Sequence, residues 1–210
     1  MIPRLCHIFR MSVIWATTLW HTLATKVKLE AMGVRVGRGL VVTGPVTIRV
    51  HPDGRMQIGE RCRLNSGSAV NPIGGHRRIV IWVGRGARLE IGNRVGLSNC
   101  TIVALESVLI GDDTMVGGDS TIVDSDFHSL DAGRRLQRPD VGVRHLPVVI
   151  GARVFVGMAA KILKGTKVGA ESVIGAGAVV TRTVGEREIW AGNPAVRVKT
   201  LQSAGRQEEG

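Results

Sequence analysis

Aliphatic residues return at every sixth position along residues 150–184 of this chain. The key positions are Ile150, Val156, Ile162, Val168, Ile174 and Val180, and a small or compact residue follows each one four positions later: Val154, Ala160, Thr166, Ser172, Ala178 and Val184. A period of six fits neither an α-helix, with about 3.6 residues per turn, nor a strand, with a period of 2. Each hexad is therefore predicted to form one short strand and one turn, stacked on its neighbours in a solenoid.

Glycine follows four of these aliphatic residues directly, as Gly151, Gly157, Gly169 and Gly175. Glycine at a turn indicates either a positive φ or a close approach of two backbones. We expect the aliphatic residue to point into the core and the small residue to fit where the chain turns inward.

The same pattern extends toward the N-terminus in a looser form. Its key positions are Val36, Val42, Ile48, Ile58, Leu64 and Val70, then, after a turn-rich excursion at residues 71–76, Val83, Leu89, Ile91, Leu97, Val103, Ile110, Val116 and Ile122, with one extra residue near Leu109. A long interruption, residues 127–147, separates the two clean runs. An insertion in a repeat array must leave the stack, so we expect this segment to protrude as a functional loop. Residues 31–200 are expected to form the repeat domain, and residues 201–210 a polar, disordered tail.

Residues 1–30 form a different segment, apolar but interrupted by basic residues and histidines. The longest uncharged run, residues 11–24, is shorter than the roughly 20 residues of a bilayer-spanning helix. No signal-peptide cleavage site is expected here. Four apolar residues fall near one helical face: Ile8, Trp15, Leu19 and Leu23. We expect a helix that packs on the solenoid. Its two tryptophans and basic flanks leave open the alternative that it lies at a membrane surface.

The composition supports a solenoid and limits the partners. Aromatic residues make up only 3%, so thin layers of aliphatic and small residues must fill the core. The net charge of +11 implies an anionic partner or a heavily solvated surface, and phosphate groups of a cofactor or of a lipid-linked substrate would suit it. Nucleic acid is not expected, because no aromatic residues interleave with the arginines.

The three cysteines, Cys6, Cys62 and Cys100, are widely spaced and odd in number. This spacing argues against a disulfide framework or a zinc knuckle and favours a reducing compartment. We expect a cytoplasmic protein, peripheral to the inner face of a membrane if residues 1–30 touch one.

Three segments resemble a known family. Residues 150–157, residues 173–181 and the closing Ala191-Gly-Asn-Pro-Ala195 are similar to the C-terminal coils of the hexapeptide-repeat acyltransferases. The stretch Asp124-Ser-Asp-Phe-His-Ser-Leu-Asp131 resembles the active-site loop of their sugar and polysaccharide O-acetyltransferase branch. The resemblance covers about residues 34–200. It implies an all-β solenoid: a left-handed parallel β-helix with three hexads per triangular coil, although parallel crossovers are otherwise right-handed.

The resemblance further implies a homotrimer with active sites between subunits, acetyl-CoA as donor, a small-molecule or glycan acceptor and no metal. The reaction would move an acetyl group to a sugar hydroxyl in surface polysaccharide or glycoconjugate assembly. A neutral hydroxyl is a weak nucleophile, so a base must take its proton, and an imidazole titrates near neutral pH. His128 matches the general base of the family, with direct attack and no acyl-enzyme.

A histidine base needs a group that holds its other nitrogen. Asp126 and Asp131 are the candidates and Asp124 a weaker one, although loop aspartates also serve ordinary turns. Asn99 matches an asparagine that contacts the acceptor in the family, but it could equally be a turn residue at a coil corner. Cys100 beside it has no adjoining basic residue, so it is not expected to act as a nucleophile.

The donor residues also follow from the resemblance. Phe155, Gly157, Ala159 and Ala176 are expected along the pantetheine arm, and Thr181 and Arg182 near the adenosine end. Arg197 and Lys199 could meet the phosphates of CoA. The sequence departs from the family here, because Val196 stands where a basic residue usually follows Asn-Pro-Ala.

Other activities remain open at this point. A trimeric carbonic anhydrase would need paired histidines that the sequence lacks, and the distinct features of serine and antibiotic acetyltransferases are missing. The remaining alternatives are an acyltransferase with a non-sugar acceptor and a non-catalytic trimeric scaffold.

Overall fold

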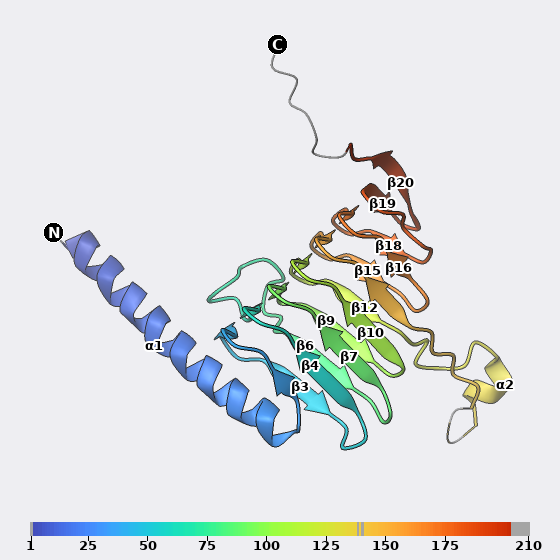
Figure 1. Cartoon of the computed structure of the whole chain (residues 1–210), viewed down its shortest axis with the longest axis horizontal. Helices are drawn as coiled ribbons and strands as arrows, with labels where there is room; N and C mark the ends of the chain where they lie inside the picture. The colour runs from blue at the N-terminus through green and yellow to red at the C-terminus, as the bar shows by residue number, and fades with distance from the viewer. Residues whose placement is uncertain (1, 138, 140, 203–210) are drawn as a thin grey trace, which may run out of the picture.

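The computed structural model describes residues 2–137, 139 and 141–202, with side chains from residue 14 onward. An N-terminal helix, α1 (Ile2–Ala31), leads into a column of coils, and a short helix, α2 (Ala132–Arg135), lies on a loop that leaves the column (Figure 1). Each coil contributes one strand to each of three sheets, here called sheets A, B and C. The chain is therefore a parallel β-helix of triangular section, as predicted.

From β1 to β18, successive strands along the chain belong to sheets A, B and C in turn. Sheet A contains β1 (Arg35–Val36), β4 (Arg55–Ile58), β7 (Arg88–Ile91), β10 (Ser107–Ile110), β13 (Val148–Ile150) and β16 (Lys167–Val168). Sheet B contains β2 (Val41–Thr43), β5 (Arg63–Asn65), β8 (Gly96–Ser98), β11 (Met115–Val116), β14 (Phe155–Val156), β17 (Val173–Ile174), β19 (Glu188–Gly192) and β20 (Ala195–Thr200). Sheet C contains β3 (Thr47–Val50), β6 (Val80–Val83), β9 (Thr101–Ala104), β12 (Thr121–Val123), β15 (Lys161–Ile162) and β18 (Val179–Val180). Paired strands run parallel, and the C-terminal hairpin of β19 and β20 is antiparallel.

Successive hexads place their aliphatic residues on successive sheets. Ile150 lies in sheet A, Val156 in sheet B and Ile162 in sheet C, and the next turn repeats the order. The register stacks these residues in ladders, of which sheet A carries Val36, Ile58, Ile91, Ile110, Ile150 and Val168. All six key residues from Ile150 to Val180 are almost fully buried. The prediction of one strand per hexad and a buried aliphatic ladder is confirmed.

Two key positions were predicted wrongly. Val70 is 39% exposed, because the excursion begins before it, and the buried core resumes at Ile79 and at Ile81 in β6. In β9 the inward residue is Ile102, which pairs with Ile81 and Ile122, whereas Val103 points outward. A count of six residues per strand therefore loses the correct register wherever the chain contains an insertion or an extra residue.

The repeated glycines are explained by close approach. A Cβ on Gly151 would meet the amide nitrogen of Ala170 in the next coil at 2.7 Å, and one on Gly157 would meet that of Ala176 at 2.7 Å. The positive φ falls instead two positions later, at Arg153 (57°) and Ala159 (59°). Glycine is therefore required at these positions by the close approach of neighbouring coils, and not by a positive φ.

The small residues of each hexad are buried at the corners, as predicted. Where they carry a hydroxyl, it donates a hydrogen bond to a carbonyl of the next coil, as Ser172 does to Gly185 at 2.7 Å. Without this bond, the hydroxyl would be buried in the core with no hydrogen-bond partner.

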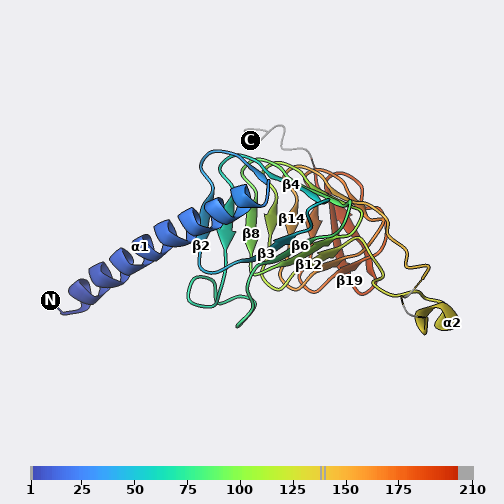
Figure 2. The ribbon, with the colours of Figure 1, turned by 90° about the horizontal axis from the view of Figure 1, so that it is seen from below.

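Helix α1 packs on the first coils with its C-terminal half. Leu29 and Thr25 are buried, and the hydroxyl of Thr22 accepts a hydrogen bond from the Val42 amide at 2.9 Å. Trp15, Leu19 and Leu23 are exposed, so α1 packs through a neighbouring face and not through the face that carries these apolar residues. The side chain of Ile8 lies outside the described residues. Figure 2 shows the N-terminal half of α1 extending away from the column.

Candidate functional site

The loop that carries His128 leaves the column at the corner between sheets C and A. It begins after β12, ends at β13 and is closed at its base by an antiparallel bridge between Ser125 and His145. The Asp126 amide donates to the Arg144 carbonyl at 3.1 Å, and the Leu146 amide donates to the Asp124 carbonyl at 2.9 Å. The loop is thus a projecting hairpin anchored at two strands (Figure 1, yellow).

Three acidic residues of this loop have different environments. Asp124 is buried, and its carboxylate accepts hydrogen bonds from the backbone amides of Leu105, Glu106 and Ser107 at 2.7–2.8 Å. Asp131 caps α2 by accepting from the Arg134 amide at 2.8 Å. Asp124 therefore holds the corner of the preceding coil, and the role of Asp131 beside His128 stays a prediction.

Asp126 forms a half-buried ion pair beside the loop base. Its Oδ1 lies 2.9 Å from the Nζ of Lys164, and the two side chains are only 17% and 21% exposed. Its Oδ2 is buried and has no hydrogen-bond partner in the described part of the chain. Lys164 stands two residues after β15, so stacking of coils, and not sequence proximity, brings it to Asp126.

A pocket of about 330 Å³ opens at this corner. Its lining includes both members of the ion pair and Thr181, which was predicted at the adenosine end of the donor. His128 is exposed on the loop two residues beyond Asp126. A second imidazole, His145, lies at the loop base opposite Ser125, and its buried Nδ1 has no partner among the residues described. Sequence reasoning predicted neither Lys164 nor His145 as a residue of this site.

Asn99 lies at another corner, between sheets B and C, and is buried. Its amide donates to the carbonyls of Asn71 (2.9 Å) and Ile73 (2.8 Å), and its Oδ1 accepts from the Gly67 amide at 2.7 Å. Both of its N–H groups therefore hold the excursion of residues 66–79 onto the column. These bonds are those expected of a turn residue at a coil corner, the alternative interpretation of Asn99. A contact between Asn99 and an acceptor stays a prediction, and it would require these hydrogen bonds to break.

The excursion forms one wall of an apolar groove of about 360 Å³. Three predicted donor residues line it, Phe155, Gly157 and Ala176, together with Met158 and Ile73. Ile73 lies so close to Gly118 that a Cβ there would meet its carbonyl oxygen at 2.5 Å. The fourth predicted residue, Ala159, lies at the turn just after Met158 with a φ of 59°.

The basic residues predicted for the donor lie on two elements: Arg182, expected near the adenosine end, follows β18, and Arg197 and Lys199, expected near the phosphates, lie on β20. Arg182 is exposed in the turn after β18, and Lys199 is exposed on β20. Arg197 donates to Glu188 at 3.1 Å, and the indole of Trp190, followed by Arg197, lowers the pKa of Glu188. Arg197 thus stabilises the C-terminal hairpin, and its contact with phosphate stays a prediction.

Cys100 is fully buried, and this burial raises its pKa to about 12. A thiol in this state supplies almost no thiolate near neutral pH, which agrees with its exclusion as a nucleophile. In the described segments no three His, Cys, Asp or Glu side chains gather as a metal site would require.

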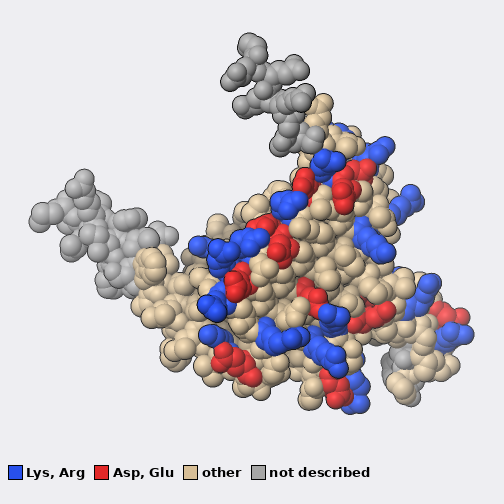
Figure 3. All heavy atoms as spheres, in the orientation of Figure 1, with Lys and Arg blue, Asp and Glu red and all other residues tan. Residues whose placement is uncertain are grey.

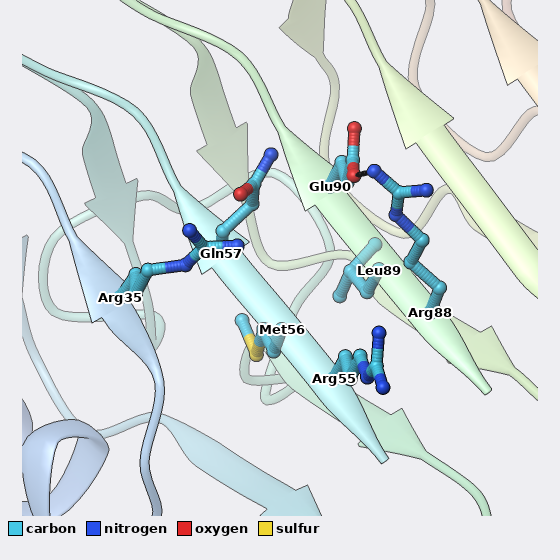
Figure 4. A pocket seen from close by; sticks show the side chains of 7 residues that line it. All are labelled: Arg35, Arg55, Met56, Gln57, Arg88, Leu89 and Glu90. Carbon is cyan, nitrogen blue, oxygen red and sulfur yellow. Dashed lines mark ion pairs between the residues drawn. The ribbon is translucent and has the colours of Figure 1, made fainter. Parts of the chain in front are cut away.

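A third hollow, of about 140 Å³, lies on sheet A near α1 and contains none of the predicted site residues. Arg35, Arg55 and Arg88 surround it, and Arg88 pairs with Glu90 (Figure 4). On the face of the column shown in Figure 3, basic and acidic side chains lie next to one another at several places, between larger areas of other residues. Ion pairs such as Arg94 with Asp113 (2.5 Å) therefore engage part of the basic charge.

The site residues thus fall into two groups at two edges of the column. The corner between sheets C and A carries Asp126, His128, Lys164 and Thr181. The corner between sheets B and C carries Asn99 and the groove of Phe155, Gly157 and Ala176. Sheet C separates the two groups within one chain.

Comparison with known proteins agrees with this architecture. Residues 147–182 match the family described as bacterial transferase hexapeptide (six repeats). The chain is 32% identical over 105 residues to a putative acetyltransferase of Schizosaccharomyces pombe, which covers 50% of this chain and 49% of that protein. It is 35% identical over 103 residues to the putative lipopolysaccharide biosynthesis O-acetyl transferase WbbJ of Escherichia coli, covering 47% and 53%. The chain thus spans about half the length of these curated relatives.

Two solved structures share the fold over most of the chain. AntD, an N-acyltransferase from Bacillus cereus crystallised with dTDP and coenzyme A, aligns with a TM-score of 0.66 at 16% identity, over 83% of this chain and 89% of AntD. The hexapeptide-repeat acetyltransferase VCA0836 of Vibrio cholerae aligns with a TM-score of 0.56 at 22% identity, over 87% and 81%. Repeat and fold together identify the chain as a hexapeptide-repeat protein of the left-handed β-helix class.

Proposed function

We propose that this protein transfers an acetyl group from acetyl-CoA to a hydroxyl of a sugar, with His128 as the general base. The observation that carries the proposal is the position of His128 on a loop of a hexapeptide β-helix, beside the half-buried pair of Asp126 and Lys164. The names of the relatives, acetyltransferases and a lipopolysaccharide O-acetyl transferase, support the same reaction and suggest a glycan acceptor.

The chemistry requires one proton to move twice. The acceptor oxygen attacks the thioester carbonyl carbon while the imidazole of His128 takes the hydroxyl proton. When the tetrahedral intermediate collapses, the carbon–sulfur bond breaks, and the imidazolium returns the proton to the departing CoA sulfur. The products are the acetyl ester and CoA, and no covalent bond to the protein forms.

Asp126 is suited to orient the imidazole. Lys164 occupies one of its carboxylate oxygens, and the other is buried without a hydrogen-bond partner in the described structure. An unpartnered buried carboxylate oxygen is costly, and an N–H from His128, two residues along the chain, would satisfy it. This contact would fix the tautomer whose free nitrogen faces the acceptor.

The apolar groove is suited to the donor. A pantetheine arm is a narrow chain, and the small side chains of Gly157 and Ala176 would allow it to approach the backbone closely. Phe155 and Met158 offer apolar surface beside it. Because this groove and His128 lie at different corners, we propose a homotrimer in which the groove of one subunit faces the loop of its neighbour.

The test is thiol release from acetyl-CoA by the purified protein, measured against a panel of sugars and nucleotide sugars. We expect His128→Ala to lower kcat by about two to four orders of magnitude. His145→Ala examines the second imidazole of the loop. His51→Ala serves as the matched control, because His51 is a partly exposed histidine between β3 and β4, outside the loop.

The outcomes separate the alternatives. A folded His128→Ala variant with near-normal turnover, or a large loss in His145→Ala alone, would contradict the assignment of the base. Binding of CoA without release for any sugar would favour a non-sugar acceptor. A protein that binds no CoA in calorimetry would favour the non-catalytic scaffold.

A further inference from the structure

Helix α1 carries an exposed apolar surface. Five large side chains are 57–73% exposed there: Trp15, Leu19, Trp20, Leu23 and Val27. At about 100° per residue they fall within roughly 140° of the helix circumference and form one continuous face. Isolated exposed apolar residues are common, but a continuous face with two tryptophans indicates a binding surface.

This face points away from the column. The side chains that α1 buries are Thr25 and Leu29, and Thr22 bonds to Val42 beside them. At about 100° per residue these three are centred roughly 120° around the helix from the apolar face. Each of the five apolar side chains is more than half exposed. The N-terminal half of α1 also extends away from the column (Figure 2).

Charge indicates which kind of surface this is. Residues 1–30 contain four Lys or Arg residues, Arg4, Arg10, Lys26 and Lys28, and one acidic residue, Glu30, which gives a net charge of +3 (4 − 1). A second copy of the helix would bring the same positive charge, whereas anionic lipid headgroups would neutralise it. Tryptophan also favours the boundary between headgroups and acyl chains, where its apolar ring is buried and its N–H stays wet.

We propose that α1 docks the protein onto an anionic phospholipid surface, lying in the plane of the interface with this apolar face toward the acyl chains. No helix in the described part of the chain is both long and apolar enough to span a bilayer, so the contact would be peripheral. The proposal is independent of the acyltransfer reaction, because it involves none of the residues assigned to that site.

Flotation of the full chain with vesicles tests this docking. One set contains phosphatidylcholine alone, and the other contains equal parts of phosphatidylcholine and phosphatidylglycerol. We expect binding to the second set and a loss of about tenfold or more in the double variant Trp15→Ser/Trp20→Ser, since each indole contributes a large apolar area. Trp82→Ser, which removes an exposed tryptophan of β6, is the matched control and should bind as the parent does.

Two further readouts make the result decisive. Lys26→Gln/Lys28→Gln should weaken binding by about fivefold per residue removed, and raised salt should weaken it further. Tryptophan emission should move to shorter wavelengths with vesicles in the parent and not in the double variant. Absence of binding to anionic vesicles, or equal binding by the double variant, would overturn the proposal. A change in oligomeric state caused by Trp15→Ser/Trp20→Ser would assign the face to a contact between copies instead.

Discussion

At the scale of single residues, the pair of Asp126 and Lys164 sets the properties of the loop base. Two opposite charges 2.9 Å apart and about four-fifths buried attract strongly, but each has lost most of its water. Their net contribution to stability is therefore small compared with the cost of removing one partner. The main effect of the pair is therefore to fix the position of the Asp126 carboxylate, and its net contribution to the stability of the fold is secondary.

This view predicts a non-additive pair of substitutions. Lys164→Met leaves the Asp126 carboxylate buried without a counter-charge, and we expect the free energy of unfolding to fall by about 1–2 kcal/mol, less than for a fully buried pair because solvent reaches both groups. The double variant Asp126→Asn/Lys164→Met should recover part of this loss. Urea denaturation of the two single variants and the double variant measures the coupling. Additive losses would show that the two charges do not interact.

The sequence could not reveal Lys164. It occupies an ordinary outward position after a clean hexad, 38 residues from Asp126, and nothing in its neighbourhood departs from the repeat. Asp126 was predictable because it lies in a motif where the hexad frame breaks. The pairing depends on the stacking of β15 under β12 and on the closure of the loop by Ser125 and His145, which are long-range features.

At the scale of elements, the excursion of residues 66–79 acts as a wall built onto a regular column. Three attachments hold it: the side chain of Asn99, the ion pair of Arg77 with Asp119 at 2.7 Å, and the close contact of Ile73 with Gly118. Since the excursion lines the groove proposed for the donor, its attachment should control the affinity for CoA.

Replacing Asn99 tests this link. Asn99→Ala leaves the carbonyls of Asn71 and Ile73 without their donor, so we expect faster hydrogen exchange within residues 67–79 and about tenfold weaker CoA binding. Asn99 has a φ of 39°, which also strains alanine, so Asn99→Gly is the control that relieves the backbone but not the lost bonds. Exchange that stays slow in both variants would mean that the other two attachments suffice.

Elements differ in how far their sequence predicts them. The regular coils were predictable because their period repeats and each aliphatic residue has the same environment in every turn. The excursion and α1 were not predictable in the same way, because neither contains a repeated sequence pattern. In α1 the apolar residues suggested a packing face, but Thr22, Thr25 and Leu29 make the contact, because only that side meets the first coils.

At the scale of the whole molecule, the two halves of the proposed site lie at different corners of the column. His128 lies at the corner between sheets C and A, and the groove with Phe155 and Ala176 lies at the corner between sheets B and C. Sheet C stands between these corners in one chain, so a donor in the groove meets the base of the same chain only around that sheet. A neighbouring copy related by a threefold axis could present its loop to the groove directly.

This arrangement predicts complementation between two inactive variants. His128→Ala removes the base but leaves the groove, whereas Ala176→Trp fills the groove at an exposed position and leaves the base. In trimers assembled at random from equal amounts of both chains, about one interface in four combines an intact base with an intact groove. Co-expressed chains should therefore recover roughly a quarter of the parent turnover, while a mixture of separately assembled variants should stay inactive. If co-expression restores nothing although mixed assemblies form, both halves of the site must belong to one chain.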